Sequence, residues 1–194
     1  FYLDLINSGP ISRSLHIWRV KVPLCIKIFM WFIHKQVILT KENLIKRRWI
    51  GSSCCYFCDH DETIQHLFLE CPLAKLLWRM IHIAFNINPP VDIESLFGTW
   101  VAGVEHTIAA RIRIGICALL WAIWNCRNNF IFNRQYNLTF LQVVFRATAW
   151  IRTSSLLTPM ESREPLVTGC NHWEMVARAL FNRFGWRLHN RIGV

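Results

Sequence analysis

Apolar residues recur at helical spacing along most of this 194-residue chain. Pro23 precedes an apolar segment over 24–38, and a proline in the first turn suits a helix because its missing N–H would have no partner there. Thr40 is a suitable N-cap for a short helix over 41–48. Pro72 starts another expected helix, which Asn88-Pro89-Pro90 ends. The predicted core faces of the first and third segments are Ile26, Phe29, Met30 and Ile33, and then Leu73, Leu76, Leu77, Met80, Ile81 and Ala84.

The second half of the chain shows the same period. Short and long helices are expected over 93–101, 106–132 and 138–153. Residues 154–170 carry two prolines, a glycine and several Ser and Thr, which is typical of a linker. Asn171 with Glu174 then resembles a capping box that starts a basic amphipathic helix over 171–194. We expect this helix to dock its apolar side on the main core.

Strand signals are short, and no Asn-Gly or Asp-Gly hairpin turn occurs. At most, a small hairpin is expected around the cysteines. The pattern predicts a mainly α fold, a small helical domain with a C-terminal amphipathic helix. The expected division is an irregular lead-in (1–14), a domain that contains the cysteine cluster (15–100), a helical extension (101–153), the linker (154–170) and the last helix (171–194).

Composition excludes a disordered chain, since 53% of the residues are hydrophobic and thirteen Phe and ten Trp are present. The most apolar run, from Ile114 to Trp124, is shorter than the roughly 20 residues that a membrane span needs, so a buried helix is expected instead. Phe1, rather than Met, begins the sequence, and the chain reads as a fragment of something longer.

Charge is unevenly distributed along the chain. The net charge is +7 over 1–49, −5 over 50–110 and +8 over 111–194, and +10 in total. A polyanionic partner would be attracted by the two flanks and repelled by the middle. A solvated surface of a basic protein would show the same totals.

Four cysteines and histidines stand at metal-ligand spacing. Cys55, Cys58, His66 and Cys71 form a C-x2-C-x7-H-x4-C pattern. Three thiolates and one imidazole complete a tetrahedral zinc site with no open position, so a structural Zn²⁺ and no hydrolysis are expected. Four further cysteines, Cys25, Cys117, Cys126 and Cys170, stand singly among apolar residues, which suggests a reducing, intracellular compartment. The nucleus is possible, but the sequence does not determine it.

The ligand choice has two alternatives. Cys54 could replace Cys55 in a C-x3-C knuckle, and His60 could compete with His66. We favour Cys55 because two-residue spacing is the commoner knuckle. We favour His66 because one helical turn then brings it and Cys71 to the same side. Phe68 and Trp78 are expected to form the apolar wall of the zinc unit. Glu62 and Thr63 are expected to cap the turn that carries His66 or to accept a hydrogen bond from His66.

This segment resembles the zinc-binding domain that follows the reverse transcriptase in plant LINE-type (non-LTR) retrotransposons. The resemblance spans residues 15–134 and implies zinc binding, contact with RNA or DNA, and the upstream reverse transcriptase portion as a partner. It rests on the line from Cys55-Tyr56-Phe57-Cys58 through His66-Leu67-Phe68 and Cys71-Pro72 to Trp78, on Trp18, Val22-Pro23, Lys27-Ile28-Phe29, Trp31, Thr40, Asn43-Leu44 and Arg48-Trp49 upstream, and on Trp121, Trp124-Asn125 and Arg127-Asn128 downstream.

Catalytic patterns are missing from this sequence. Tyr2-Leu3-Asp4-Leu5 lacks the second aspartate of a polymerase site, and ribonuclease H chemistry needs several converging carboxylates. The last aspartate is Asp92, and only four glutamates follow Glu94. We therefore expect no enzyme activity and no small-molecule substrate.

Basic residues before the knuckle are the candidate nucleic-acid contacts. Phosphates would bind Lys41, Lys46, Arg47 and Arg48, and a base would stack on Trp49. The alternative is a structural or protein-interaction module in which zinc only holds the helices together. The acidic knuckle residues Asp59, Asp61 and Glu62 favour this alternative. A remnant of an element, without a function of its own, is the other alternative. Attachment to a membrane through residues 171–187 is disfavoured.

Overall fold

The computed structural model describes residues 17–133 and 139–185. The expected lead-in over 1–14, the Tyr2–Leu5 segment and the part of the last helix beyond residue 185 lie outside the described residues. Within these ranges the fold is mainly α, as predicted, with no extended strand, and an isolated antiparallel bridge joins Cys54 to Asp61. The helices are α3 (Leu24–His34), α4 (Lys41–Lys46), the π-helical turn η1 (His66–Glu70), α5 (Pro72–Phe85), α6 (Ile93–Leu96), α7 (His106–Asn133), α8 (Phe140–Ser155) and α9 (Met160–Phe184).

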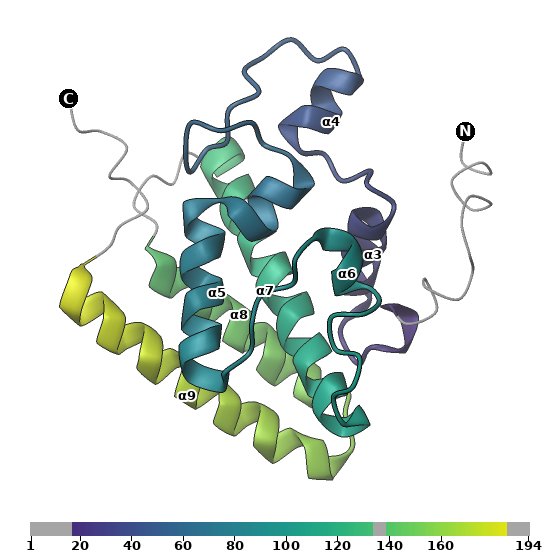
Figure 1. Cartoon of the computed structure of the whole chain (residues 1–194), viewed down its shortest axis with the longest axis vertical. Helices are drawn as coiled ribbons and strands as arrows, with labels where there is room; N and C mark the ends of the chain where they lie inside the picture. Colours follow the sequence, from purple (N-terminus) through teal and green to yellow (C-terminus); the bar gives the residue numbers. More distant parts are fainter. Residues whose placement is uncertain (1–16, 134–138, 186–194) are drawn as a thin grey trace.

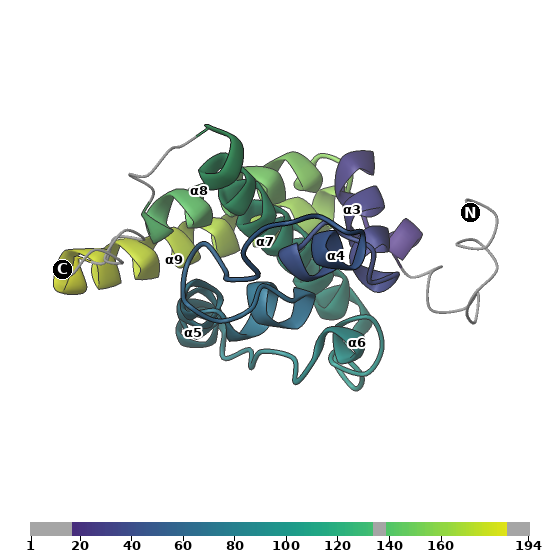
Figure 2. The ribbon, with the colours of Figure 1, turned by 90° about the horizontal axis from the view of Figure 1, so that it is seen from above.

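Helix α7 passes through the middle of the molecule (Figures 1 and 2) and contacts α3, α8 and α9. Leu119, Leu120 and Ile123 on this helix are fully buried. Among the described residues it is the one helix long and apolar enough to cross a membrane, and half of its most apolar window is buried inside the fold. That burial fits the core helix expected from the short apolar run.

The starts of α3 and α5 follow the prolines, as predicted. Pro23 is the N-cap of α3, and Pro72 is the first residue of α5. The expected core face of α3 is buried, and so is that of α5 except for Leu76 and Ala84, which are half-buried. Helix α5 ends earlier than expected, because Asn86 adopts the left-handed conformation (φ 54°) and closes it before Asn88.

The expected linker over 154–170 is wrong as local structure. Helix α8 continues to Ser155, and α9 begins at Met160, directly after Pro159. Only Pro159 acts as a break, whereas Pro165 lies inside the second turn of α9 and Gly169 in the third. Arg163 closes the turn by donating to the carbonyl of Thr158 (3.2 Å). The other proposed domain boundaries stay predictions.

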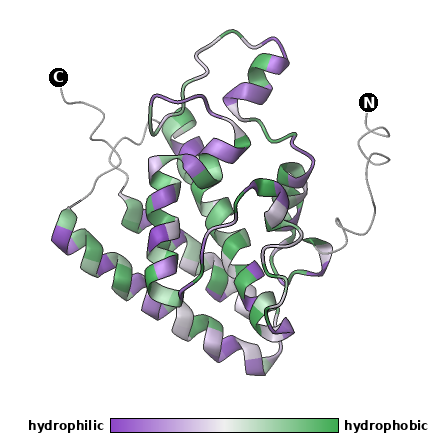
Figure 3. Ribbon diagram, viewed as in Figure 1, coloured by the Kyte–Doolittle hydropathy of each residue, from purple (hydrophilic) through white to green (hydrophobic). Residues whose placement is uncertain are grey.

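Asn171 and Glu174 do not cap a helix, because both lie in the middle of α9. Their side chains instead accept hydrogen bonds from Arg152 of α8, at 2.9 Å to Asn171 Oδ1 and 2.6 Å to Glu174 Oε1. Figure 3 shows hydrophobic and hydrophilic residues mixed along α9. Its buried residues, Leu166, Cys170, Trp173 and Ala177, face α8 and α5, so the expectation that this helix docks on the core is confirmed.

Candidate metal centre

A tight loop places the first two cysteines. The bridge between Cys54 and Asp61 closes the loop, and the N–H of Cys55 donates to the carbonyl of His60 at 2.7 Å. Inside it, the N–H of Phe57 points at Cys55 Sγ (3.4 Å). The hairpin expected around the cysteines is thus reduced to one bridge, which turns both sulfurs to the same side.

The wide turn η1 places the other two side chains. The N–H of Cys71 donates to the carbonyl of His66 at 2.7 Å, a bond across five residues that an α-helical turn does not make. The hydroxyl of Thr63 accepts the N–H of His66 (2.9 Å) and caps the turn, as expected for Thr63. A π-turn therefore does what one ordinary helical turn was expected to do, because the H-x4-C spacing needs the wider ring.

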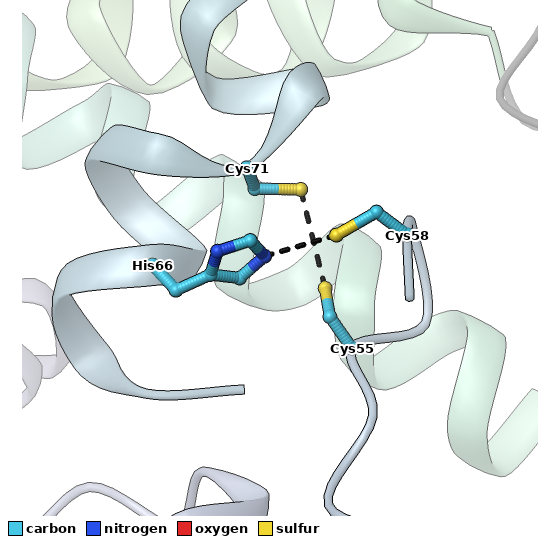
Figure 4. Close-up of side chains that lie close together, drawn as sticks. All are labelled: Cys55, Cys58, His66 and Cys71. Carbon is cyan, nitrogen blue, oxygen red and sulfur yellow. Dashed lines mark hydrogen bonds between the residues drawn. The ribbon is translucent and has the colours of Figure 1, made fainter. Parts of the chain in front are cut away.

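Figure 4 shows the four side chains pointing toward one another from these two segments. Cys55 Sγ lies 4.0 Å from Cys71 Sγ, Cys58 Sγ lies 3.0 Å from His66 Nε2, and all four ligand atoms lie within 4.8 Å of one another. A zinc tetrahedron with Zn–S bonds of about 2.3 Å has edges of about 3.8 Å, so small shifts fit the cluster to that ion. Its chemistry and size are compatible with a metal ion.

The alternative ligands lie outside this cluster. The Cys54 side chain is not part of it, and the Cys54 carbonyl accepts a hydrogen bond from the Lys41 ammonium. The ring of His60 stacks on that of His66 with centroids 5.6 Å apart. The structure therefore brings together the four residues that the spacing favoured.

The thiols of the cluster titrate as a group. A hydrogen bond from Cys71 lowers the pKa of Cys55 to about 6, and the same shared proton raises the pKa of Cys71 far above its usual value. Burial raises the pKa of Cys58. A bound cation would favour the deprotonated form of all three, because metal ligands must be deprotonated.

The lone cysteines of the core differ from the cluster. Burial raises the pKa of Cys117 and of Cys126 to about 12, and that of Cys170 to about 11. These thiols stay protonated at neutral pH and act as small apolar side chains. They offer no competing ligands.

A buried ion pair ties the cysteine loop to α7. Glu62 is fully buried and accepts hydrogen bonds from Arg127 Nη2 at 2.6 Å and Nε at 3.1 Å, and from the N–H of Lys41 at 3.0 Å. The expected cap or His66 contact of Glu62 is thus replaced by this pair. One signal for Arg127 is present in the sequence, since it is the one charged residue between Arg113 and Arg134. Phe68 and Trp78 are both buried, and Trp78 Nε1 donates to the carbonyl of Phe68 (2.9 Å). Their expected packing against the zinc unit stays a prediction.

The basic candidates separate into two groups. Lys41 is only 7% exposed, and its ammonium lies 3.9 Å from the ring centroid of Tyr56, while burial lowers its pKa. It is therefore held inside the fold, and its expected role as a phosphate contact is wrong for this conformation. The other four are exposed at and after the end of α4: Lys46, Arg47, Arg48 and Trp49.

Comparison with known proteins gives the context of this centre. Residues 7–78 match the family described as zinc-binding in reverse transcriptase. That match confirms the resemblance as far as residue 78, and the four clustered side chains all fall inside it. The family is an accessory zinc-binding domain rather than a catalytic one.

One curated relative, from Arabidopsis thaliana, is named as a putative ribonuclease H protein. It is 30% identical over 63 residues, which cover 32% of this chain and 10% of that protein. The chain therefore spans about a tenth of the length of the relative. No solved structure matches.

Proposed function

We propose that Cys55, Cys58, His66 and Cys71 bind one Zn²⁺ as a structural ion in a retrotransposon protein. The observation that carries this is the convergence of three sulfurs and one imidazole within 4.8 Å, inside the segment that matches the zinc-binding family. Four protein ligands leave no open coordination position, so the ion joins the cysteine loop to η1 and α5 and supplies no reactive water.

Metal content tests this proposal. Elemental analysis of the purified chain should find one zinc per molecule, and Cys55→Ser and His66→Ala should each lose it. Cys54→Ser and His60→Ala are matched controls, because they change the neighbouring cysteine and histidine that lie outside the cluster. If Cys55→Ser retains zinc and Cys54→Ser loses it, Cys54 rather than Cys55 is the ligand, and the assignment proposed here is wrong.

The function that this zinc unit supports best is assistance in RNA or DNA binding beside the reverse transcriptase of a plant LINE-type element. Lys46, Arg47 and Arg48 are exposed in one turn, and Arg48 itself adopts a left-handed conformation (φ 66°). Trp49 follows, 42% exposed, with its ring lying against Gly51, where an added Cβ would come within 2.1 Å of the indole. The glycine thus lets the indole lie flat and leaves a stacking surface beside three cations.

Salt dependence tests the nucleic-acid role. Lys46→Ala and Arg48→Ala should each weaken oligonucleotide binding and reduce the slope of log K against log salt concentration by about 1. Lys75→Ala on α5, an exposed lysine in the acidic part of the chain, is the control. An unchanged slope in both variants would exclude these contacts.

A protein-interaction module is the second candidate. Asp59 and Asp61 are exposed on the cysteine loop and would repel phosphate near the metal. In this case the partner would be the upstream reverse transcriptase portion, and the Lys46 and Arg48 variants would leave nucleic-acid affinity unchanged. Both candidates place the protein inside the cell, and neither uses a small-molecule substrate.

A further inference from the structure

An open groove lies between α3 and α7, and none of the four clustered ligands lines it. Its volume is about 550 Å³, within the range of about 300–1,000 Å³ of small-molecule sites. Aliphatic and aromatic side chains of α3, of residues 37–39 and of α7 line it, together with one cation. The lining residues that matter here are Ile28, Phe32, Leu39, Arg47, Trp121 and Trp124.

The walls of this groove are apolar and exposed. Ile28, Phe32 and Leu39 are 39%, 40% and 42% exposed, although the opposite face of α3 is already buried in the core. A helix that is apolar on all sides is normally covered on all sides. An open apolar face of this kind marks a surface for a binding partner.

The floor of the groove is rigid. The Trp121 ring meets Phe29 edge-on at 5.0 Å and Trp150 at 6.5 Å. The Trp124 ring is covered by the Arg127 guanidinium at 4.9 Å, and Arg127 is in turn fixed by Glu62. Both indoles are therefore held in place before any ligand binds, which lowers the entropy lost on binding.

Charge limits the identity of the occupant. Residues 17–58 contain eight basic side chains and one acidic side chain, Glu42, which pairs with Lys46 at 2.6 Å. Arg47 is part of the groove wall itself. The chemistry that fits combines flat apolar faces with negative charge. Unpaired bases on a phosphate backbone have both, whereas a duplex hides its base faces in the stack.

We propose that this groove binds the unpaired bases of single-stranded nucleic acid. Phe32 and the two indoles give the stacking surfaces, and Arg47 contacts a phosphate or stacks on a base. The inference rests on the proposed nucleic-acid function and adds a preference for single strands. Lys46 and Arg48 then track the backbone as it leaves the groove.

The experiment measures fluorescence anisotropy of the zinc-loaded full chain with a labelled single-stranded oligonucleotide, as RNA and as DNA, and with a hairpin duplex of equal charge. Single strands should bind more tightly than the duplex. Phe32→Ala should weaken single-strand binding about tenfold and leave duplex binding unchanged. Phe132→Ala, which removes a phenylalanine that is 75% exposed and does not line the groove, should change neither.

Photocrosslinking gives a second measurement that needs no substitution. An oligonucleotide carrying 5-iodouracil should label peptides that contain Phe32, Trp121 or Trp124. Two results would overturn the groove proposal but leave the proposed function standing. The first is equal affinity for single strands and duplex. The second is single-strand affinity that is unchanged in Phe32→Ala but reduced in Lys46→Ala and Arg48→Ala, which would mean that the groove binds a protein segment instead. A chain that binds neither probe would overturn both.

Discussion

Single residues of the metal centre differ in how readily they give up a proton. Cys55 gives up its proton most readily, because the hydrogen bond from Cys71 lowers its pKa, whereas the pKa values of Cys58 and Cys71 are raised. Zinc binding at pH 7 should therefore release at least about two protons, those of Cys58 and Cys71, and zinc affinity should rise with pH. Calorimetric titration of the zinc-free chain in buffers of different ionisation enthalpy counts these protons. Cys54→Ser should release the same number, and a count of zero would contradict the assignment.

Arg127 carries the other residue-scale prediction. Replacing it by Leu leaves the Glu62 carboxylate fully buried without its counter-ion, which should cost about 3–5 kcal/mol of unfolding free energy. Urea unfolding of the zinc-loaded chain measures this loss. Arg79→Leu, on the exposed side of α5, should change the unfolding free energy by less than about 0.5 kcal/mol. A similarly small change for Arg127→Leu would mean that the pair contributes nothing.

Most helices could be predicted from the sequence, because each buries a regular apolar face. The faces of α3 and α5 are clear examples, since proline marks both starts. The start of α9 could not be predicted in this way. Pro165 and Gly169 are breakers by propensity, but packing against α8 outweighs that preference. Asn171 and Glu174 matched a local capping pattern, yet their partner Arg152 lies on a different helix.

The contact between α8 and α9 gives a prediction at the scale of elements. Burial raises the pKa of Glu174, but hydrogen bonds from Arg152 and Thr148 outweigh it, so the pKa lies below its usual value of 4.5. A lowered carboxyl pKa adds stability above pH 4.5 that is lost as the pH falls through the folded-state value.

Glu174→Gln should therefore destabilise the chain by about 0.5–1 kcal/mol at pH 7, and the difference from the unchanged protein should shrink below pH 4.5. Urea unfolding at several pH values measures it. Acid also protonates the zinc ligands, but this effect is the same in Glu174→Gln and in the unchanged protein. It therefore cancels in the difference between their unfolding free energies. Glu164→Gln, at an exposed glutamate on the same helix, is the control and should change the unfolding free energy at pH 7 by less than about 0.5 kcal/mol.

For the whole molecule, the matched family segment and the folded unit have different boundaries. The match ends at residue 78, but residues inside it contact α7. The Glu62 carboxylate pairs with Arg127, Phe57 packs edge-on against Phe130 with ring centroids 5.5 Å apart, and the ring centroids of Phe29 and Trp121 lie 5.0 Å apart. These contacts join residues more than sixty positions apart. Local spacing predicted the four clustered ligands, but no local pattern could pair Glu62 with Arg127 or bury Lys41.

A truncation tests whether the zinc unit folds without α7. In a fragment covering residues 1–105, Phe29 loses its contact with Trp121, Phe57 loses its contact with Phe130, and Glu62 loses its cation. Burying an unpaired carboxylate is more costly than leaving it in water. Zinc binding alone should therefore not fold the cysteine loop and η1 against α3 in this fragment. We expect the zinc-loaded fragment to show no cooperative thermal transition by circular dichroism, and addition of residues 106–194 as a separate chain to restore one. A fragment that melts cooperatively at the temperature of the full chain would instead make the zinc unit an independent domain, with α7 to α9 attached to it.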